Sequence, residues 1–324
     1  MISVVIPAYN SGGVIEKCIH SLLEQTYQQF ELIVVNDGST DNTASVVERL
    51  SYTDKRIKLI NRPNGGAAAA RNSGLKVANG NYIVFVDSDD YVEPRYLEEL
   101  LKCGDTPETM GIVRMIYEGR ALTRLTAESH SYELGSDLAD DYFNGHFGSE
   151  IAFSASNKLF ERQVLINHRI TFPENIKIGE DMIFVFRYLC YMKRVTVSAK
   201  ALYHYVINAS SVTLSGNTDY PAEYEKTLNS LRAIDENGVC VGKEVIRRWA
   251  LEVMTYSLMC PFVTRKSYSD FKAYMYAFYH SMLCRSAASC RIQTDIKRRA
   301  IRFCLAHRKT YLLYILIKCN KLIS

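Results

Sequence analysis

Apolar and polar positions alternate between two kinds of pattern along the first hundred residues. Short apolar runs predict strands, which we place at 3–7, 31–35, 57–60 and 81–86. Apolar residues at helical spacing predict helices, which we place at 14–25, around 46–50 and at 67–78. Such alternation is typical of an α/β domain with a parallel sheet and right-handed crossovers.

Beyond residue 101 the pattern is less regular. It predicts strands at 110–117 and 202–206, a short helix at 134–143, and an amphipathic helix that begins at Glu180 and Asp181. From Tyr220 onward the chain is expected to be helical. The sequence therefore predicts a mostly parallel sheet flanked by helices and followed by a helical C-terminal extension.

Three carboxylates follow directly on the fourth apolar run. Tyr82–Val86 has no polar position, which favours a strand buried on both faces, and Asp87, Asp89 and Asp90 come next. Open α/β sheets bind ligands at the carboxyl ends of their strands. Oxygen ligands there suit Mg²⁺ or Mn²⁺, which take further ligands from substrate phosphates. The alternative is an acidic turn without a ligand.

Composition and charge narrow the classes of protein. With 48% hydrophobic and 23% charged residues, the chain has an ordinary globular composition. Nine cysteines without a CxxC pair, and no apparent signal peptide, lead us to expect reduced thiols in the cytoplasm. The net charge of +4 is uneven, because residues 291–324 carry nine basic residues against Asp295. Nothing resembles a nucleic-acid-reading motif, so we expect no nucleic-acid partner.

The loop after the first strand does not fit the common nucleotide-binding patterns. It contains neither G-x-G-x-x-G nor a P-loop, so a nucleotide would be held by side chains. Tyr9 offers an aromatic face and Asp37 a carboxylate at two neighbouring strand ends. The alternative for Asp37 is an ordinary Asp-Gly turn.

Four segments in order carry a family resemblance: SVVIPAYN at 3–10, VNDGSTD at 35–41, NGG with ARNSG within 64–74, and FVDSDD at 85–90. Together they resemble the family 2 glycosyltransferases, inverting enzymes with the GT-A fold that use nucleotide-sugar donors. Each motif is weak by itself, but four in register over some ninety residues are specific.

The resemblance implies a set of donor-binding residues. Pro7, Ala8 and Tyr9 would lie at the base, Asp37 would accept the base imide N–H, and Ser39 would lie beside it. Arg71 would approach the base and phosphates, unless it is a solvated helix residue. Asp87, followed by Ser88, would hold the ribose, and Asp89 would bind a divalent metal (Mn²⁺ or Mg²⁺) at the diphosphate. Asp90 would cap the helix that begins near Pro94, or brace Asp89.

On the acceptor side, Glu180 and Asp181 match the family's Glu-Asp motif. The resemblance implies that Asp181 is the general base that deprotonates an acceptor hydroxyl. Acids at a helix start also have a structural explanation, because they favour the positive end of the helix dipole. Residues 156–160 are similar to the family's Asn-Lys-Leu segment. Val206 stands where family members often have Arg; His204 would replace its diphosphate contact or make a local hydrogen bond.

These inferences give an expected domain plan. Residues 1–218 would form the GT-A catalytic domain, with a nucleotide-sugar half at 1–103 and an acceptor half at 104–218. Residues 219–324 would form a helical region in which the basic segment 291–324 lies on a membrane surface, or else packs on the catalytic domain. Residues 245–249 lack the Gln of the processive synthase signature, which favours transfer of one sugar.

The expected function is an inverting, metal-dependent hexosyltransferase. It would move one sugar from a nucleotide-diphosphate sugar, with UDP expected, to a glycan or lipid-linked oligosaccharide during bacterial capsule or lipopolysaccharide synthesis. The alternative is a nucleotide-sugar-binding partner of another transferase, without turnover.

Overall fold

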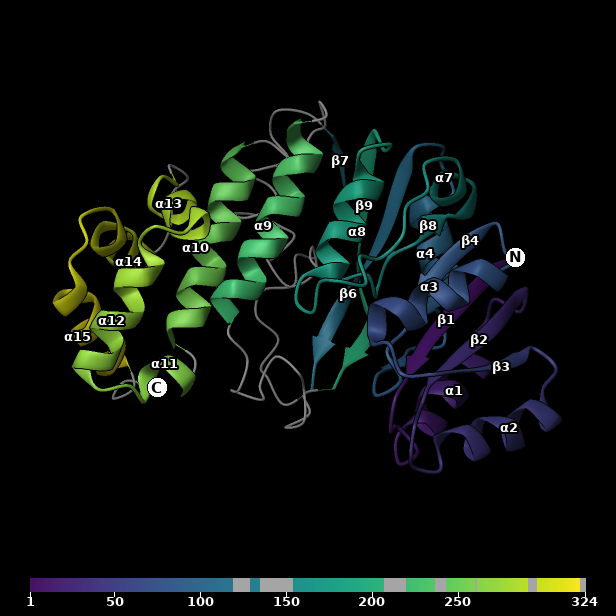
Figure 1. Ribbon diagram of the computed structural model, residues 1–324. Helices are drawn as coiled ribbons and strands as arrows, with labels where there is room; N and C mark the ends of the chain where they lie inside the picture. Colours follow the sequence, from purple (N-terminus) through teal and green to yellow (C-terminus); the bar gives the residue numbers. More distant parts are fainter. Residues whose placement is uncertain are drawn as a thin grey trace. The chain divides into compact units, whose positions relative to one another are not determined.

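The structure is a computed structural model that describes residues 1–118, 129–134, 154–206, 220–236, 243–259, 261–290 and 296–320 (Figure 1). The chain divides into two compact units. Met1–Asn175 and Glu180–Asn208 form one, here called the sheet unit, and Ile176–Gly179 and Ala209–Ser324 form the other, here called the helical unit. The domain boundary expected at 218 and 219 lies outside the described residues, as do residues 135–143 of an expected helix.

A five-stranded sheet in the order β3-β2-β1-β4-β8 forms the centre of the sheet unit. Its strands are β1 (Ile2–Ala8), β2 (Phe30–Asp37), β3 (Ile57–Arg62), β4 (Tyr82–Phe85) and β8 (Phe160–Glu161). The first four pair in parallel, and β8 runs antiparallel to β4. The mostly parallel sheet predicted from the sequence is therefore confirmed.

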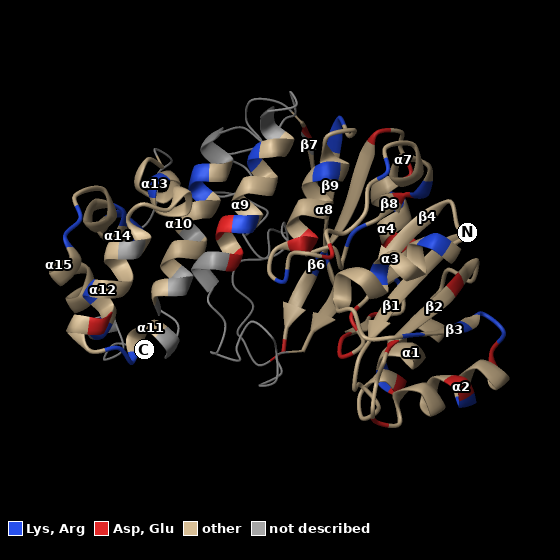
Figure 2. Cartoon of the chain, in the orientation of Figure 1, with Lys and Arg blue, Asp and Glu red and all other residues tan. Residues whose placement is uncertain are grey.

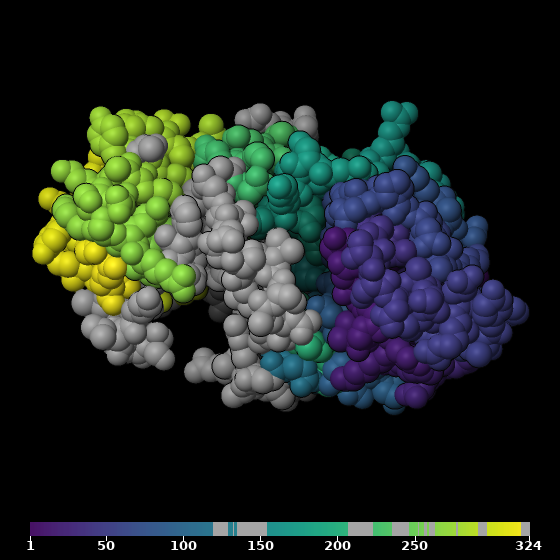
Figure 3. Space-filling view, turned by 60° about the horizontal axis from the view of Figure 1, so that its bottom comes forward, coloured from purple at the N-terminus to yellow at the C-terminus, as the bar shows by residue number. Residues whose placement is uncertain are grey.

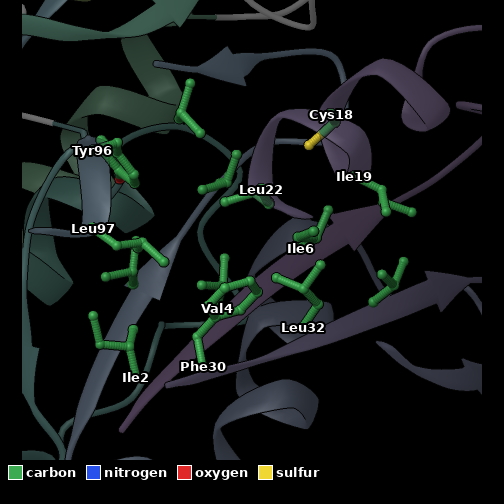
Figure 4. Packing of buried hydrophobic residues seen from close by; sticks show 14 of the residues in the cluster. Ile2, Val4, Ile6, Cys18, Ile19, Leu22, Phe30, Leu32, Tyr96 and Leu97 are labelled. Atoms are coloured by element: carbon green, nitrogen blue, oxygen red, sulfur yellow. The ribbon is translucent and has the colours of Figure 1, made fainter. Parts of the chain in front are cut away.

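Helices connect the parallel strands, as the alternation of patterns predicted. α1 (Ile15–Leu23), α2 (Thr43–Thr53) and α3 (Ala67–Val77) lie between successive parallel strands. α4 (Tyr96–Gly104), α7 (Arg162–Asn167) and α8 (Glu180–Leu189) come later in the chain. On one face of the sheet, alternate residues of β1 pack against Cys18, Ile19 and Leu22 of α1 (Figure 4). This packing removes the side chains of that face from water and supplies much of the driving force for folding.

The opposite face of the same strands is also covered. A Cβ atom on Gly74 would lie 2.4 Å from Cγ1 of Val5, so α3 packs closely on β1. From β4, Phe85 meets Phe184 of α8 edge to face, with ring centroids 5.6 Å apart. Both faces of the central strands are therefore buried, which explains why their sequences are apolar without alternation.

A second, four-stranded sheet was not foreseen from the sequence. It contains β5 (Tyr91–Val92), β9 (Arg194–Tyr205) and β6 (Thr109–Tyr117) in that order, with β7 (His130–Glu133) also paired to β9. β9 begins eight residues before the strand expected at 202–206. β5 comes directly after the three aspartates at the end of β4 and pairs with the end of β9. This pairing holds the C-terminal end of the acidic turn in place.

The described part of the helical unit consists of helices, as predicted for the chain after Tyr220. They are α9 (Tyr220–Glu236), α10 (Lys243–Met259), α11 (Pro261–Thr264), α12 (Tyr268–Phe278), α13 (Met282–Ala288), α14 (Ile296–Ala306) and α15 (Thr310–Asn320). Residues of α15, in yellow, are visible on the surface of this unit (Figure 3). Within the described ranges, no helix has both the length and the apolar character needed to cross a bilayer.

Candidate active site

The loops that follow β1, β2 and β4 are tied to one another by hydrogen bonds. The backbone N–H of Asn10 donates to Oγ of Ser39 over 3.0 Å, and Thr40 donates its N–H to Oδ1 of Asn10 over 2.8 Å. The hydroxyls of Ser11 and Ser88 are 2.7 Å apart. The three strand ends chosen from the sequence therefore form one surface. The Ser88 side chain is buried and engaged within the protein.

Tyr9 lies at the end of β1 with 52% of its surface exposed, next to the buried Ala8 and the half-buried Pro7. An exposed aromatic ring beside a rigid strand end loses little freedom when a flat ligand stacks on it. The position of Tyr9 fits the expected contact with a base.

Asp37 is buried, and its carboxylate organises the loop that leads into α3. It accepts hydrogen bonds from Nη1 of Arg62 and from the backbone N–H groups of Gly65 and Gly66, at 2.5–3.2 Å. A carboxylate has about four acceptor positions, so these donors leave capacity for one more. Asp37 therefore has a structural role in addition to any contact with a base.

Arg71 links three carboxylates from two distant parts of the chain. From α3, Nη2 donates to Oδ1 of Asp87 over 2.8 Å and Nη1 to Oδ1 of Asp181 over 2.7 Å. A third carboxylate, Glu180, lies 3.5 Å from Nη1. The Arg71 side chain is 6% exposed, so the alternative of a solvated helix residue is wrong. One guanidinium thus brings the predicted ribose ligand and the predicted base into one network.

Residues that precede β8 hold the same two carboxylates from another side. The N–H of Ala155 donates to Oδ2 of Asp181 over 3.1 Å, and the hydroxyl of Ser156 donates to Oδ2 of Asp87 over 3.3 Å. Sequence reasoning did not include either residue in the site. The similarity of 156–160 to a family segment was a signal for Ser156, and nothing in the sequence pointed to Ala155.

The electrostatics of this network follow from burial and from the crowding of like charges. Burial raises the pKa of Asp181, while the charge of Arg71 acts in the opposite direction. Burial, followed by the charge of Asp181, raises the pKa of Glu180 to about 7. Burial disfavours the charged form of Arg71, but the charges of Asp181, Asp87 and Glu180 outweigh it and raise the pKa of Arg71. A carboxylate with a raised pKa is a better proton acceptor than an exposed one.

Asp90 differs from its neighbours in the acidic turn. Its buried carboxylate accepts a hydrogen bond from the hydroxyl of Tyr203 over 2.6 Å and from the N–H of Val206 over 2.8 Å. Burial, together with the charge of Asp87, raises the pKa of Asp90 to about 8. The α4 N-terminus has no side-chain cap, so the expected cap by Asp90 is wrong. Asp90 instead fastens the turn to β9, which the local sequence did not indicate.

Asp89 is half-buried at the same strand end. Among the residues that the structure describes, no three His, Cys, Asp or Glu side chains are grouped as a metal site. Mg²⁺ and similar cations are often held by one or two carboxylates together with substrate phosphates. Asp89 is the carboxylate of this turn to which the family resemblance assigns such a role.

His204 makes local contacts. Its Nδ1 lies 2.9 Å from a carboxylate oxygen of Glu118, and its Nε2 lies 2.7 Å from one of Glu93. The imidazole also stacks on Tyr91. Of the two alternatives for this histidine, the geometry favours the local one. Residues 207–219, which follow β9, are not described.

Residues 3–168 match the family model described as Glycosyl transferase family 2. This segment is more than half of the chain and includes Tyr9, Asp37, Arg71, Asp87 and Asp89. The chain belongs to glycosyltransferase family 2. The resemblance drawn from the four motifs is therefore confirmed. Within this family 2 protein, Asp181 lies beyond the matched segment, so its role depends on the geometry around Arg71.

Three similar proteins place this family 2 chain among its relatives. EpsH of Bacillus subtilis is 31% identical over 213 residues, which are 65% of this chain and 62% of EpsH. The poly(ribitol-phosphate) beta-glucosyltransferase of Bacillus spizizenii is 31% identical over 246 residues, 72% of this chain and 37% of that enzyme. The chain thus matches less than two thirds of the length of either relative.

The third is a solved structure, residues 1–349 of S. aureus TarS in complex with UDP-GlcNAc. It superposes with a TM-score of 0.73 at 21% identity and covers 100% of this chain and 92% of that one. The expected GT-A fold with a helical C-terminal region is therefore confirmed for this family 2 protein. At this identity the likeness establishes the fold and not the substrate.

Proposed function

We propose that the protein is a metal-dependent, inverting glycosyltransferase that moves one sugar from a nucleoside diphosphate sugar to a hydroxyl of a surface polysaccharide precursor. The observation that carries the proposal is the double ion pair of Arg71 with Asp87 and Asp181. It holds a carboxylate at the donor-binding strand end close to a half-buried carboxylate at a helix start, which is the arrangement expected if the donor and the base share one site.

The donor end of the proposed site is built from the strand ends. Tyr9 stacks on the base, with Pro7, Ala8 and Ser39 as the surrounding loop, and Asp37 uses its remaining acceptor capacity for the base imide. Asp87, held by Arg71 and Ser156, accepts a ribose hydroxyl, and the backbone of Ser88 lines the same turn. UDP is the proposed nucleotide, in keeping with the UDP-GlcNAc bound by the similarly folded TarS.

Asp181 is the proposed base. It accepts the proton of the acceptor hydroxyl as the hydroxyl oxygen attacks the anomeric carbon, and the bond from that carbon to the diphosphate breaks on the other face. One displacement inverts the anomeric centre. A divalent cation held by Asp89 and the donor phosphates would stabilise the negative charge of the departing diphosphate.

A donor screen tests the proposal and separates it from the alternative of a binding partner without turnover. Thermal shift with UDP-, GDP- and dTDP-sugars in the presence of MnCl₂ should identify a donor that raises the Tm. That donor should then release its nucleoside diphosphate during turnover. Binding without any release or transfer would favour the non-catalytic alternative.

Asp89→Ala is expected to weaken Mn²⁺-dependent binding of UDP by at least about tenfold, because the metal loses its protein ligand. Isothermal titration of UDP with and without MnCl₂ measures the effect. Asp54→Ala, at the turn after α2, is the control and should change neither titration. An unchanged Mn²⁺ dependence in Asp89→Ala would remove this residue as the ligand.

We also propose that the acceptor is lipid-linked and that the helical unit touches the inner face of the cytoplasmic membrane. From 296 to 320 the chain has seven Lys and Arg and no acid, and Figure 2 shows no red on α14 or α15. Where α14 turns into α15, Arg308 and Lys309 are exposed beside Phe303, Tyr311 and Leu312, which are 44–62% exposed. Basic residues with exposed aromatic and aliphatic groups suit an anionic lipid surface.

The double variant Arg308→Glu/Lys309→Glu is expected to reduce binding to phosphatidylglycerol vesicles by more than tenfold, since each basic residue near such a surface contributes about 1 kcal/mol. Co-sedimentation with vesicles measures the effect. The control is Lys55→Glu/Lys102→Glu in the sheet unit, which should bind as the unaltered protein does. If the unaltered protein does not sediment with anionic vesicles, these helices have a packing role only.

A further inference from the structure

Lys158 is a basic residue placed where solvent does not reach. Its relative exposure is 0%, although it lies close enough to the site for its charge to act on Asp181. Its Nζ donates to the carbonyl oxygen of Ser154 over 2.5 Å and to Oδ1 of Asn157 over 2.9 Å. Burial lowers the pKa of Lys158 to about 7, and the charge of Asp181 counteracts this shift.

Stability alone does not account for a lysine at this position. Removing an ammonium group from water costs several kcal/mol, roughly, and a methionine of similar length would fill the same space without that cost. A buried lysine that donates to the main-chain oxygen of Ser154 and to the side-chain oxygen of Asn157 therefore has a role that an apolar side chain could not fill. The contacts of the Nζ group indicate what this role is.

The segment Ser154–Lys158 is short and tightly constrained. Val113 of β6 donates its N–H to the carbonyl of Asn157 over 3.1 Å, and Asn157 returns a hydrogen bond from Nδ2 to the carbonyl of Val113 over 2.6 Å. Asn157 has a φ of +62°, in the left-handed region. Ser156 forms an isolated bridge with Phe85 at the end of β4. The segment thus links the two sheets of the unit.

This segment directs polar groups at both carboxylates of the proposed mechanism. Ala155 and Ser156 donate to Asp181 and Asp87, as described above. The hydrogen bond from Lys158 to the carbonyl of Ser154 joins the two ends of the segment. Ser154 directly precedes the two donors, Ala155 and Ser156. Without it, the peptide that contains the Ala155 N–H would lose the contact that fixes its orientation.

We propose that Lys158 is a positioning residue for proton transfer: by holding the Ser154–Asn157 turn it orients Asp181 and keeps this carboxylate ionised. The proposal rests on the proposed role of Asp181 as the base. Lys158 does not touch the reacting atoms. It acts through the Ala155 N–H and, in its protonated form, through its positive charge, both of which favour the carboxylate form of Asp181.

The test is Lys158→Met, assayed with the donor that gives the largest thermal shift and, for binding, with UDP and MnCl₂. The kcat should fall by about tenfold or more, because a small misplacement of a reacting group is costly. The acidic limb of the kcat profile should move to higher pH, since loss of the cation raises the pKa of Asp181. The Kd for UDP should stay within about twofold, because Arg71 still holds Asp87, the proposed ribose ligand.

A matched control and a second variant keep the test decisive. Lys200→Met removes a lysine that pairs with Glu99 over 2.6 Å in the same unit and should leave kcat and the pH profile unchanged. Asn157→Gly tolerates the left-handed backbone but removes one acceptor of Lys158, so it should lower kcat by a smaller factor. It carries the test if Lys158→Met does not fold.

Three results would overturn the proposal: an unchanged kcat and pH profile in folded Lys158→Met, an equal loss of kcat and UDP affinity, or an unchanged kcat in Asn157→Gly. Failure of the proposed function is distinguishable, because it would leave Asp181→Asn active. If Asp181→Asn is inactive and the Lys158 and Asn157 variants are unaffected, only the positioning role is wrong.

Discussion

Asp181→Asn is expected to reduce the rate of sugar transfer by about a thousandfold while UDP still binds. General-base catalysis contributes roughly 10²–10⁴ in rate, and an amide of the same shape accepts no proton at neutral pH. The donor-side contacts of Asp87 and Asp89 remain, so the Kd for UDP and MnCl₂ should change little. Steady-state transfer with the donor identified by thermal shift, together with isothermal titration, measures both quantities.

The pH profile gives the same prediction a second readout. Because burial raises the pKa of Asp181, the acidic limb of kcat should lie at higher pH than for an exposed aspartate. The rate of transfer should therefore increase as the pH rises through the pKa of Asp181. Any residual activity of Asp181→Asn should not show this acidic limb.

Glu180→Gln is the matched comparison, since Glu180 is adjacent and also close to Arg71. We expect it to retain most activity. An inactive Glu180→Gln together with an active Asp181→Asn would exchange the two roles. Equal loss of UDP binding and transfer in Asp181→Asn would show that the residue supports the donor site and is not the base.

Arg71→Met is expected to destabilise the sheet unit by about 3–5 kcal/mol and to reduce transfer by about a hundredfold. Removing one partner of a buried ion pair leaves the other charges uncompensated, and here the carboxylates of Asp87, Asp181 and Glu180 lose their shared cation. Asp87 and Asp181 also lose their common anchor, so the reacting groups are misplaced. Urea unfolding and steady-state transfer measure the two losses.

The destabilisation should depend on pH in a defined direction. Carboxyl groups with raised pKa values bind more protons in the folded state than in the unfolded state, so stability falls as the pH rises between the two values. For Glu180 this window lies between the ordinary value of 4.5 and about 7. Loss of Arg71 raises these pKa values further, so the variant should gain more stability than the unaltered protein when the pH is lowered from 8 to 5.5.

Arg71→Lys and Arg49→Met complete the experiment. Lysine keeps a cation but cannot make the two-pronged contact, so stability should be largely kept while transfer stays low. Arg49 pairs with Glu16 on the exposed surface, and its loss should be close to neutral in both measurements. If Arg71→Met changes neither the free energy of unfolding nor the rate of transfer, the three carboxylates are not ionised together in the folded protein.

The sequence by itself determined the architecture near the N-terminus and the residues at the strand ends. Residues 83–86 are buried, and a strand that is buried on both faces requires apolar side chains at successive positions. The acids after such a run must leave the sheet at its carboxyl edge, so Asp87 and Asp89 could be located without coordinates. The four motifs identified the family because each is local in sequence; three lie at strand ends, and the fourth, within 64–74, leads into α3.

Only the tertiary structure decided how these residues are held. Arg71 and Asp181 are 110 positions apart, and no local pattern states that they form an ion pair. Asp90 looked like a helix cap from its neighbours, but pairing of β5 with β9 brings Tyr203 and Val206 to it instead. The partners of a buried charged group depend on which helices and strands pack together. This packing results from contacts throughout the whole unit, so no single segment of the sequence specifies it.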